Sequence, residues 1–139
     1  MTLEGLPVFA SNTASVQRSS EYPALVGKRV LVVDDEAVAC IDYSYQLRER
    51  GAKAEAIVST NAAALIFLES HPIDAAILDY RLRDGTSKPL MEWLRNHQIP
   101  FLIISGWVEM LPHEANVAPI LEKPLLHDEL CQALSDLLD

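Results

Sequence analysis

The feature that most constrains this chain is an alternation of short apolar runs with longer amphipathic segments, which begins at Lys28. The first run, residues 29–33, is rich in β-branched residues and shows no polar alternation, as expected of a strand that is covered on both faces. Strands that alternate with helices indicate βαβ units and a parallel sheet. We therefore expect an α/β fold over residues 28–139, built on a doubly wound, five-stranded parallel sheet.

Apolar runs and helical periodicity place the other elements. Further strands are expected at residues 54–58, 74–78, 100–104 and 117–121, and helices up to about residue 50 and at 62–70, 88–97 and 125–138. Thr60 or Asn61 can cap the second helix. The segment 107–119 contains two prolines. Because proline interrupts a helix, we expect the fourth helix to be short or irregular.

Two of the expected helices carry apolar stripes. Val38, Ile41 and Tyr45 share one face of the first helix, which Gly51 ends as a C-cap. We expect the stripe on the last helix to lie in the core, with an outer edge that a partner can contact. The residues of this second stripe are Leu126, Leu130, Leu134 and Leu137.

Residues 1–27 show no sustained periodicity and contain a Ser/Thr/Asn-rich stretch at 11–20. We expect a flexible N-terminal extension, separate from the folded domain at 28–139. The first basic residue is Arg18, and no apolar run approaches the ~18 residues that a membrane span needs. We therefore expect no signal peptide, no membrane insertion and a cytoplasmic location.

The charge balance excludes one class of partner. Twenty acidic and eleven basic residues give a formal net charge of −9 at pH 7. Such a surface repels nucleic acids on average, and because the sequence offers no strong basic patch we expect no nucleic-acid partner. Cys40 and Cys131 are far apart and form no CxxC motif, so we expect small buried residues rather than a zinc site or a disulfide framework.

Polar residues stand where four of the expected strands end. They are Asp34 and Asp35, then Asp79, Ser105 and Lys123. Open α/β sheets bind ligands at the carboxyl ends of their strands, so we expect these side chains to meet. Two carboxylates about 4 Å apart repel by on the order of 4 kcal/mol at an effective dielectric of about 20. A cation must balance the three acids, and Mg²⁺ suits a site of few carboxylates completed by water and phosphate oxygens.

The same residue types indicate phosphoryl chemistry. A carboxylate beside Mg²⁺ and a lysine can attack phosphorus and become an aspartyl-phosphate, because the two cations neutralise charge on the transferred oxygens. Lys123 can meet the phosphate as a point charge, and Ser105 can donate a hydrogen bond to the transferred group. Asp34 and Asp35 also have a simpler interpretation, as acidic residues that favour the N-terminus of the first helix.

Four segments carry a family resemblance. Residues 31–36 (LVVDDE), 76–79 (AILD), 103–106 (IISG) and 121–124 (LEKP), in this order, resemble the CheY-like receiver domain of two-component response regulators. The resemblance covers residues 28–139. It implies a flavodoxin-like (βα)₅ fold and a phosphorelay signalling protein that takes its phosphoryl group from a sensor histidine kinase or a phosphotransfer protein.

The resemblance also implies a role for each site residue. Asp79 is expected to be the phosphoacceptor, and Asp34 and Asp35 are expected to bind Mg²⁺ together with it. The backbone carbonyl of Arg81 is expected to be a further metal ligand. The implied phosphate and switch residues are Ser105, the switch hydroxyl, and Lys123, with Gly106, Trp107 and Pro124 flanking them.

Departures from the family pattern bear on switching. Arg83 stands where the turn after the phosphoacceptor usually has a proline, and Ile120 replaces the aromatic switch residue. The stretch 105–123 is also shorter than usual. Residues 100–107 are similar to the Pro-Phe-x-Phe-Ala-Thr-Gly type motif of an alphaproteobacterial subgroup that lacks the aromatic switch, with Ile-Ile-Ser in place of the Phe-Ala-Thr core. We therefore expect activation to work by ordering the loop 105–119.

Two large aromatic residues, Tyr80 and Trp107, lie beside the site in the sequence. For both we expect partial burial against neighbouring loops rather than contact with a ligand. Trp107 and Arg81 stand two positions after Ser105 and Asp79, respectively. In receivers these positions flank the water path to the phosphoryl group, so we expect this bulky pair to slow its loss.

The chain ends directly after the last expected helix, so we expect a stand-alone, single-domain response regulator. It would signal through an unknown downstream protein or drain phosphoryl groups from a kinase, with no enzymatic activity beyond its own phosphorylation and dephosphorylation. One alternative is a degenerate receiver that acts as an unphosphorylated scaffold. Another is an aspartate-based phosphohydrolase, although such hydrolases usually separate their two acids by two positions. No GxGxxG or GxxxxGK[ST] phosphate loop is present.

Overall fold

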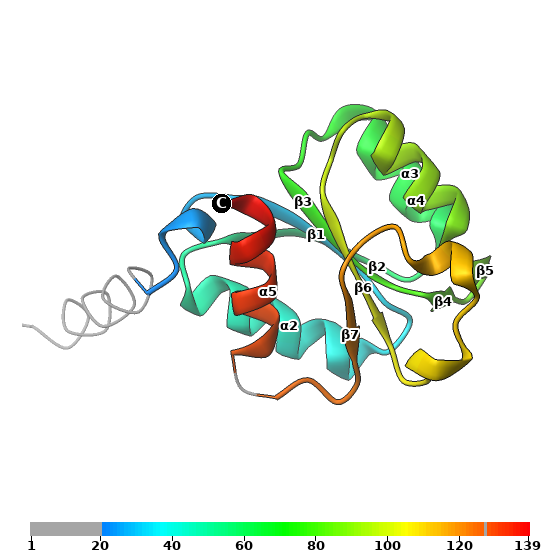
Figure 1. Ribbon diagram of the computed structural model, residues 1–139. Helices are drawn as coiled ribbons and strands as arrows, with labels where there is room; N and C mark the ends of the chain where they lie inside the picture. The colour runs from blue at the N-terminus through cyan, green and yellow to red at the C-terminus, as the bar shows by residue number, and fades with distance from the viewer. Residues whose placement is uncertain (1–20, 127) are drawn as a thin grey trace, which may run out of the picture.

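The computed structural model describes residues 21–126 and 128–139. Five parallel strands form one sheet in the order β2-β1-β3-β6-β7 (Figure 1). This is the doubly wound α/β architecture that the sequence predicted. The strands are β1 (Arg29–Val33), β2 (Lys53–Val58), β3 (Ala75–Asp79), β6 (Phe101–Ser105) and β7 (Ile120–Glu122).

Two helices cover each face of the sheet (Figure 1). On one face lie α2 (Ala37–Glu49) and α5 (Glu129–Leu138), and on the other lie α3 (Asn61–Ser70) and α4 (Lys88–Asn96). Successive residues of β1 point to opposite faces, so Val30 and Val32 pack with α2 and α5 whereas Leu31 and Val33 pack with α3 and α4. Burial on both faces explains why this strand reads as a continuous apolar run.

The connection from β6 to β7 contains two short 3₁₀ turns in place of a regular helix. They are η2 (Val108–Met110) and η3 (His113–Ala115). Pro112 lies between the two turns in an extended conformation, so the turns do not join into one helix. The prediction of an irregular fourth helix is therefore confirmed.

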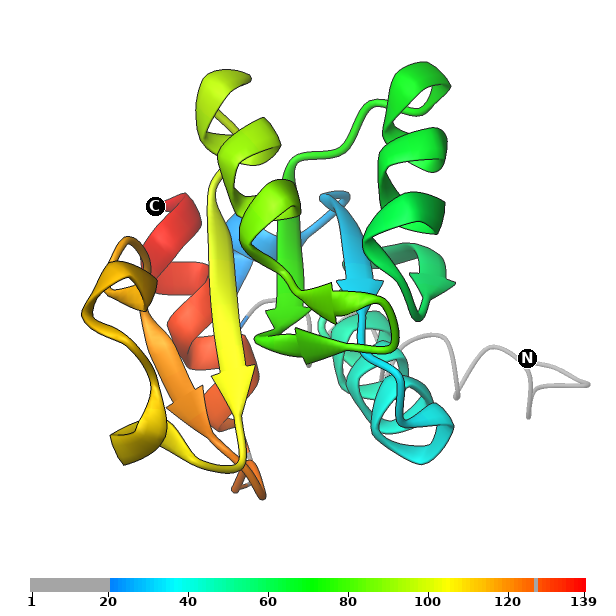
Figure 2. The ribbon, with the colours of Figure 1, turned by 90° about the vertical axis from the view of Figure 1, so that its right-hand side faces the viewer.

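A second, two-stranded sheet follows β3 and was not predicted. It is a hairpin of β4 (Arg81–Leu82) and β5 (Gly85–Thr86), which pair antiparallel. Figure 2 shows this green hairpin beside the carboxyl end of β3. Such short strands carry almost no periodicity, which is why no strand was expected here.

The apolar stripe on α2 does not face the core. Val38, Ile41 and Tyr45 are 81%, 66% and 63% exposed. Their spacing correctly indicated a helix, but a spacing does not say which face packs on the sheet. The buried face of α2 consists of Cys40, Tyr43, Ser44 and Leu47.

The start of the last helix also differs from the prediction. α5 begins at Glu129, so Leu126 precedes it and is exposed, while Leu130 and Leu134 are fully buried. The leucine stripe is therefore a core stripe only in part. The fifth strand likewise begins later than expected, at Ile120.

Part of the expected N-terminal extension packs on the domain. Residues 21–27 contain the 3₁₀ turn η1 (Pro23–Leu25), whose leucine is fully buried among the residues between the sheet and α5. Arg50, at the end of α2, forms an ion pair with Glu21. The rest of the expected extension, residues 1–20, lies outside the described residues. None of the described helices combines the length and apolar character that crossing a membrane requires.

Candidate functional site

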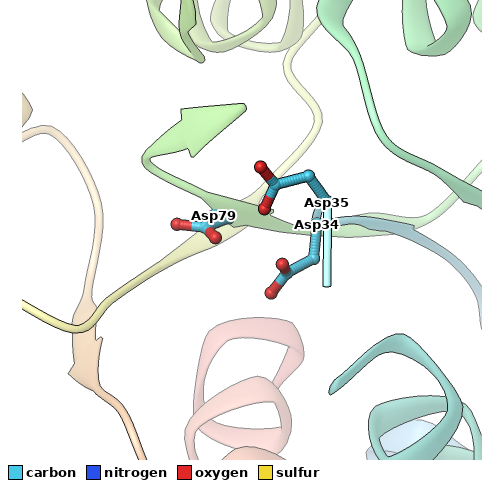
Figure 3. A group of neighbouring side chains, drawn as sticks. All are labelled: Asp34, Asp35 and Asp79. Carbon is cyan, nitrogen blue, oxygen red and sulfur yellow. The ribbon is translucent and has the colours of Figure 1, made fainter. Parts of the chain in front are cut away.

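Strand pairing brings three carboxylates together. Asp34 and Asp35 directly follow β1, and Asp79 ends β3. Because Val33 lies opposite Leu78 in the parallel β1–β3 pair, the residues that follow come side by side. One carboxylate oxygen of each aspartate lies within 4.8 Å of the others. Figure 3 shows the three side chains gathered at the ends of the two strands.

The two aspartates after β1 have different surroundings. Asp34 is 3% exposed, and its Oδ1 accepts a hydrogen bond from the backbone N–H of Glu36 at 2.9 Å. This bond stabilises the turn before α2, but it caps no N–H of the helix: the N-cap is Glu36, and the helix start has no side-chain capping bond, so the simpler capping interpretation is not supported. The other oxygen, Oδ2, lies 2.9 Å from the Lys123 ammonium. Asp35 is exposed to solvent at the mouth of the site.

Lys123 supplies the positive charge of the cluster. Its Nζ lies 2.9 Å from Asp34 Oδ2, 3.0 Å from Asp79 Oδ2 and 2.7 Å from Glu36 Oε1. The backbone N–H of Lys123 also donates to the Ser105 carbonyl at 2.8 Å, which extends the pairing of β7 with β6. Glu36 was not among the predicted site residues, although its place directly after the two aspartates was a signal that could have identified it.

Burial and ion pairing change the protonation of the site. Burial raises the pKa of Asp79 to about 6; the hydrogen bond from Lys123 opposes the rise and the Asp34 carboxylate adds to it. Burial disfavours the Lys123 ammonium, but hydrogen bonds to Glu36, Asp34 and Asp79 outweigh it and raise the pKa of Lys123. The hydrogen bond with Lys123 lowers the pKa of Glu36. At neutral pH the site therefore holds a charged lysine beside the ionised carboxylate of Glu36.

Ser105 lies next to the carboxylate cluster. β3 and β6 are neighbours with Asp79 opposite Ile104, so the next residue of β6 reaches the same edge. Ser105 is buried, and its Oγ accepts a hydrogen bond from the backbone N–H of Trp107 at 3.1 Å. Because the oxygen is the acceptor in this bond, the hydroxyl hydrogen can be donated to another group.

One cleft of about 440 Å³ is lined by Asp35, Glu36, Asp79, Ser105 and Lys123. Its floor is polar, whereas Trp107 and Met110 form an apolar wall on the side of the β6–β7 connection. The residues around the cleft are Asp35, Glu36, Asp79, Arg81, Ser105, Gly106, Trp107, Met110, Leu111 and Lys123.

The two aromatic residues beside the site behave differently. Tyr80 is buried in the core between the sheet and α3 and α4, so the expectation of only partial burial against neighbouring loops was wrong for this residue. Trp107 is 71% exposed, so the expectation of partial burial for this residue was wrong. Its indole lines the cleft at the start of the 3₁₀ turn η2.

The remaining predicted residues lie at the rim or behind it. Arg81 opens the β4–β5 hairpin, and its backbone N–H donates to Asp79 Oδ1 at 3.3 Å. Ile120 lies opposite Ile103 in the sheet and packs toward α3 and α4. The peptide bond between Lys123 and Pro124 is cis.

No family profile and no curated protein sequence matches this chain. Solved structures do. A CheY-like receiver domain of a response regulator from Methylobacillus flagellatus superposes with a TM-score of 0.71 at 26% identity, over 80% of this chain and 98% of the other. SdrG from Sphingomonas melonis is 34% identical, with a TM-score of 0.71, over 84% of this chain and 98% of SdrG. This chain is a CheY-like response regulator receiver domain.

Other similar structures agree with this assignment. The BeF₃-activated conformation of SdrG matches the receiver with a TM-score of 0.72 at 33% identity, over 82% of this chain and 98% of the other. The stress response regulator PhyR shares the fold at 23% identity and a TM-score of 0.73; the match covers 88% of this chain and 49% of PhyR. The SdrG and PhyR relatives are alphaproteobacterial, as the resemblance to that subgroup predicted.

Proposed function

We propose that this receiver accepts a phosphoryl group on Asp79 in a Mg²⁺-dependent reaction. The observation that carries the proposal is the position of the Lys123 ammonium, 3.0 Å from Asp79 Oδ2 and 2.9 Å from Asp34 Oδ2. A cation held there neutralises the negative charge of an incoming phosphoryl group. The hydroxyl of Ser105 adds a hydrogen-bond donor on the neighbouring strand.

The donor set at this edge fits Mg²⁺. This ion prefers oxygen ligands at about 2.0–2.1 Å in octahedral geometry, so its ligands lie about 3–4 Å apart. One carboxylate oxygen from each of Asp34, Asp35 and Asp79 lies within 4.8 Å of the other two, close to that range. The carbonyl of Arg81 is proposed as a further ligand. When bound, Mg²⁺ would neutralise charge on the transferred phosphoryl oxygens.

The chain's own residues account for the transfer. A carboxylate oxygen of Asp79 attacks the phosphorus of a phosphohistidine, the P–O bond forms, and the P–N bond breaks as the imidazole leaves with its electron pair and takes up a proton. Lys123 remains beside the new aspartyl-phosphate, and Ser105 donates its hydroxyl hydrogen to a phosphoryl oxygen. We propose that the protein catalyses no reaction beyond its own phosphorylation and dephosphorylation, and that it acts in the cytoplasm.

We further propose that the phosphodonor protein covers the exposed stripe on α2. The stripe of Val38, Ile41 and Tyr45 begins one turn after the acidic residues of the cleft. A histidine that enters the cleft must bring its surrounding surface against this helix. Exposed contiguous apolar side chains of this kind are typical of protein interaction surfaces.

The docking proposal has a matched pair of variants. Ile41→Asp on α2 should slow phosphotransfer from a phosphorylated histidine phosphotransfer protein by roughly tenfold, the effect of about 1.4 kcal/mol lost at the interface. Ile66→Asp is the control, because Ile66 is equally exposed but lies on α3, behind the opposite face of the sheet. Phosphorylation by acetyl phosphate should be unchanged in both. Equal slowing in the two variants would remove α2 as the docking surface.

The central experiment distinguishes the receiver from the unphosphorylated scaffold. The protein is incubated with acetyl phosphate and Mg²⁺, and the adduct is measured by intact mass and acid lability, with Asp79→Asn as the control. We expect a phosphoryl adduct on the wild type alone. A parallel experiment uses BeF₃⁻, since the similar SdrG adopts a BeF₃-activated conformation. No adduct and no response to BeF₃⁻ would favour the scaffold, whereas sustained release of phosphate from added phosphomonoesters would favour the hydrolase.

A further inference from the structure

The hairpin that follows the proposed phosphoacceptor is too small to be stable on its own. β4 and β5 pair through Arg81 with Thr86 and Leu82 with Gly85, and one further backbone bond, from the Ser87 N–H to the Tyr80 carbonyl at 2.8 Å, closes the open end of the hairpin. An isolated pair of strands is marginal in water even when longer. Leu82 is buried in the core and holds one corner of the hairpin. Outside the strand pairing, the turn makes one long backbone bond, from the Arg83 N–H to the Ser59 carbonyl at 3.4 Å, and its shorter bonds come from a side chain.

That side chain is Asp84, in the turn of the hairpin. Its Oδ1 accepts hydrogen bonds from the backbone N–H of Asn61 at 2.9 Å and from Asn61 Nδ2 at 3.2 Å. Its Oδ2 accepts from the backbone N–H of Ala62 at 3.1 Å. These N–H groups belong to the first turn of α3, where they have no partner within the helix. One carboxylate therefore ties the hairpin to the start of α3.

Asn61 also bonds directly to the second strand of the hairpin. Its Nδ2 also donates to the backbone carbonyl of Thr86 at 2.8 Å, and Thr86 is the residue paired with Arg81. Asn61 is a buried polar residue, so its side chain has little freedom to choose other partners. The position of Arg81 is thus linked through Thr86, Asn61 and Asp84 to the helix.

We propose that Asp84 is a positioning residue for the metal site: through its bonds to α3 it holds the β4–β5 hairpin so that the Arg81 carbonyl faces Asp79. The inference rests on the proposed function, in which that carbonyl binds Mg²⁺. The proline that usually stiffens this turn is replaced by Arg83 in this chain. The Asp84 carboxylate supplies the stiffness by hydrogen bonding instead.

Thr60 provides a matched control. Its side chain accepts a hydrogen bond from the backbone N–H of Ala63 at 3.0 Å and so stabilises the same first turn of α3. It makes this bond within the helix and not to the hairpin. Thr60→Ala should therefore lower thermal stability in the same way as Asp84→Ala without moving Arg81.

The test measures binding of Mg²⁺ alone, by titration followed through backbone amide NMR shifts, alongside thermal unfolding. Asp84→Ala should weaken Mg²⁺ binding about tenfold, the lower end of the range for residues that orient metal ligands. Asp84→Asn keeps one acceptor oxygen, which can bond to Asn61 or to Ala62 but not to both, and should recover part of the affinity. Thr60→Ala should bind Mg²⁺ within about twofold of the wild type, because removing a helix cap leaves the ligand positions unchanged.

Several outcomes overturn the proposal. Wild-type affinity in Asp84→Ala would reduce Asp84 to a helix cap. An equal loss in Thr60→Ala would trace the effect to the stability of α3. If Asp84→Ala does not fold, Asn61→Ala takes its place, with weakened Mg²⁺ binding again expected. Failure of the wild type itself to bind Mg²⁺ would instead overturn the proposed function.

Discussion

Two connections meet at the carboxyl edge of the sheet, and they are built differently. The one after β3 forms the β4–β5 hairpin, in which Leu82 is buried and Asp84 bonds to α3. The one after β6 is a longer run with two 3₁₀ turns, where Trp107 and Met110 are exposed. Among the described residues, all three in η2 are at least partly exposed. The first connection is suited to hold ligand geometry, and the second is suited to respond to what is bound.

The phosphoryl group itself should reveal this difference most strongly. On addition of BeF₃⁻ and Mg²⁺, the amides of 105–119 should gain protection from hydrogen exchange as Ser105 turns toward the bound group, while those of 81–86 change little. Asp79→Asn should abolish the response, because the carboxylate oxygen that carries the group is missing. Hydrogen exchange by mass spectrometry checks both regions at once. An unchanged 105–119 segment in the wild type would contradict activation through this loop.

Stability should separate the two connections next. Leu82→Ala removes a buried side chain from the core and should cost about 2–4 kcal/mol of unfolding free energy. Met110→Ala trims an exposed side chain and should stay within about 0.5 kcal/mol of the wild type. Urea unfolding measures both. Similar losses would mean that the β6–β7 connection is held as firmly as the hairpin.

The partly buried carboxylate of Asp79, which lies between the two connections, should lower the free energy of unfolding. Burial raises the pKa of Asp79 to about 6 from an ordinary value of 3.8, so the folded state binds a proton more tightly than the unfolded chain. Stability therefore falls as the pH rises through this window, and the whole penalty is present at pH 7. Without Mg²⁺, Asp79→Asn should stabilise the protein by roughly 1–3 kcal/mol at neutral pH, and by less at pH 5.

A control variant identifies the cause of that change. Asp42→Asn removes an exposed carboxylate of α2 that lies outside the cleft. Urea unfolding at the two pH values should show no pH-dependent gain for it. A gain of equal size would point to the net charge of −9 rather than to the buried site.

The smallest expected effect concerns the lifetime of the phosphoryl group. Trp107 and Arg81 come from the two different connections and both line the cleft. If they limit the approach of water, Trp107→Ala should hydrolyse its aspartyl-phosphate several-fold faster than the wild type. Decay of the phosphorylated protein after removal of the donor measures this rate. Unchanged or slower decay in the variant would exclude the shielding role.

The sequence predicted the central sheet well because burial on both faces leaves a continuous apolar run, as in residues 29–33. It also located the acidic residues and Lys123, since strand ends in a parallel sheet share one edge. It failed where the elements are short. The paired strands of the hairpin show no periodicity, and the Asp84–Gly85 pair was the one local signal for this turn.

The sequence also failed to predict which face of a helix packs on the sheet and which distant segments come into contact. The apolar spacing of Val38, Ile41 and Tyr45 indicated a helix, yet the side that packs on the sheet is the one with Cys40 and Leu47. Helical periodicity is a property of the segment alone. The choice of the packed face depends on how the helix docks against strands that are distant in the sequence.

The sequence by itself thus determined the α/β class, the order of the main elements and the residues that stand at the strand ends. Only the tertiary structure decided that Glu36 joins Lys123, that Trp107 stays exposed, and that Asp84 ties the hairpin to α3. The physical reason is the distance along the sequence between the residues that interact. Strand and helix patterns arise from neighbours within a few positions, whereas the Lys123 to Glu36 contact joins residues 87 positions apart, which only the folded sheet brings together.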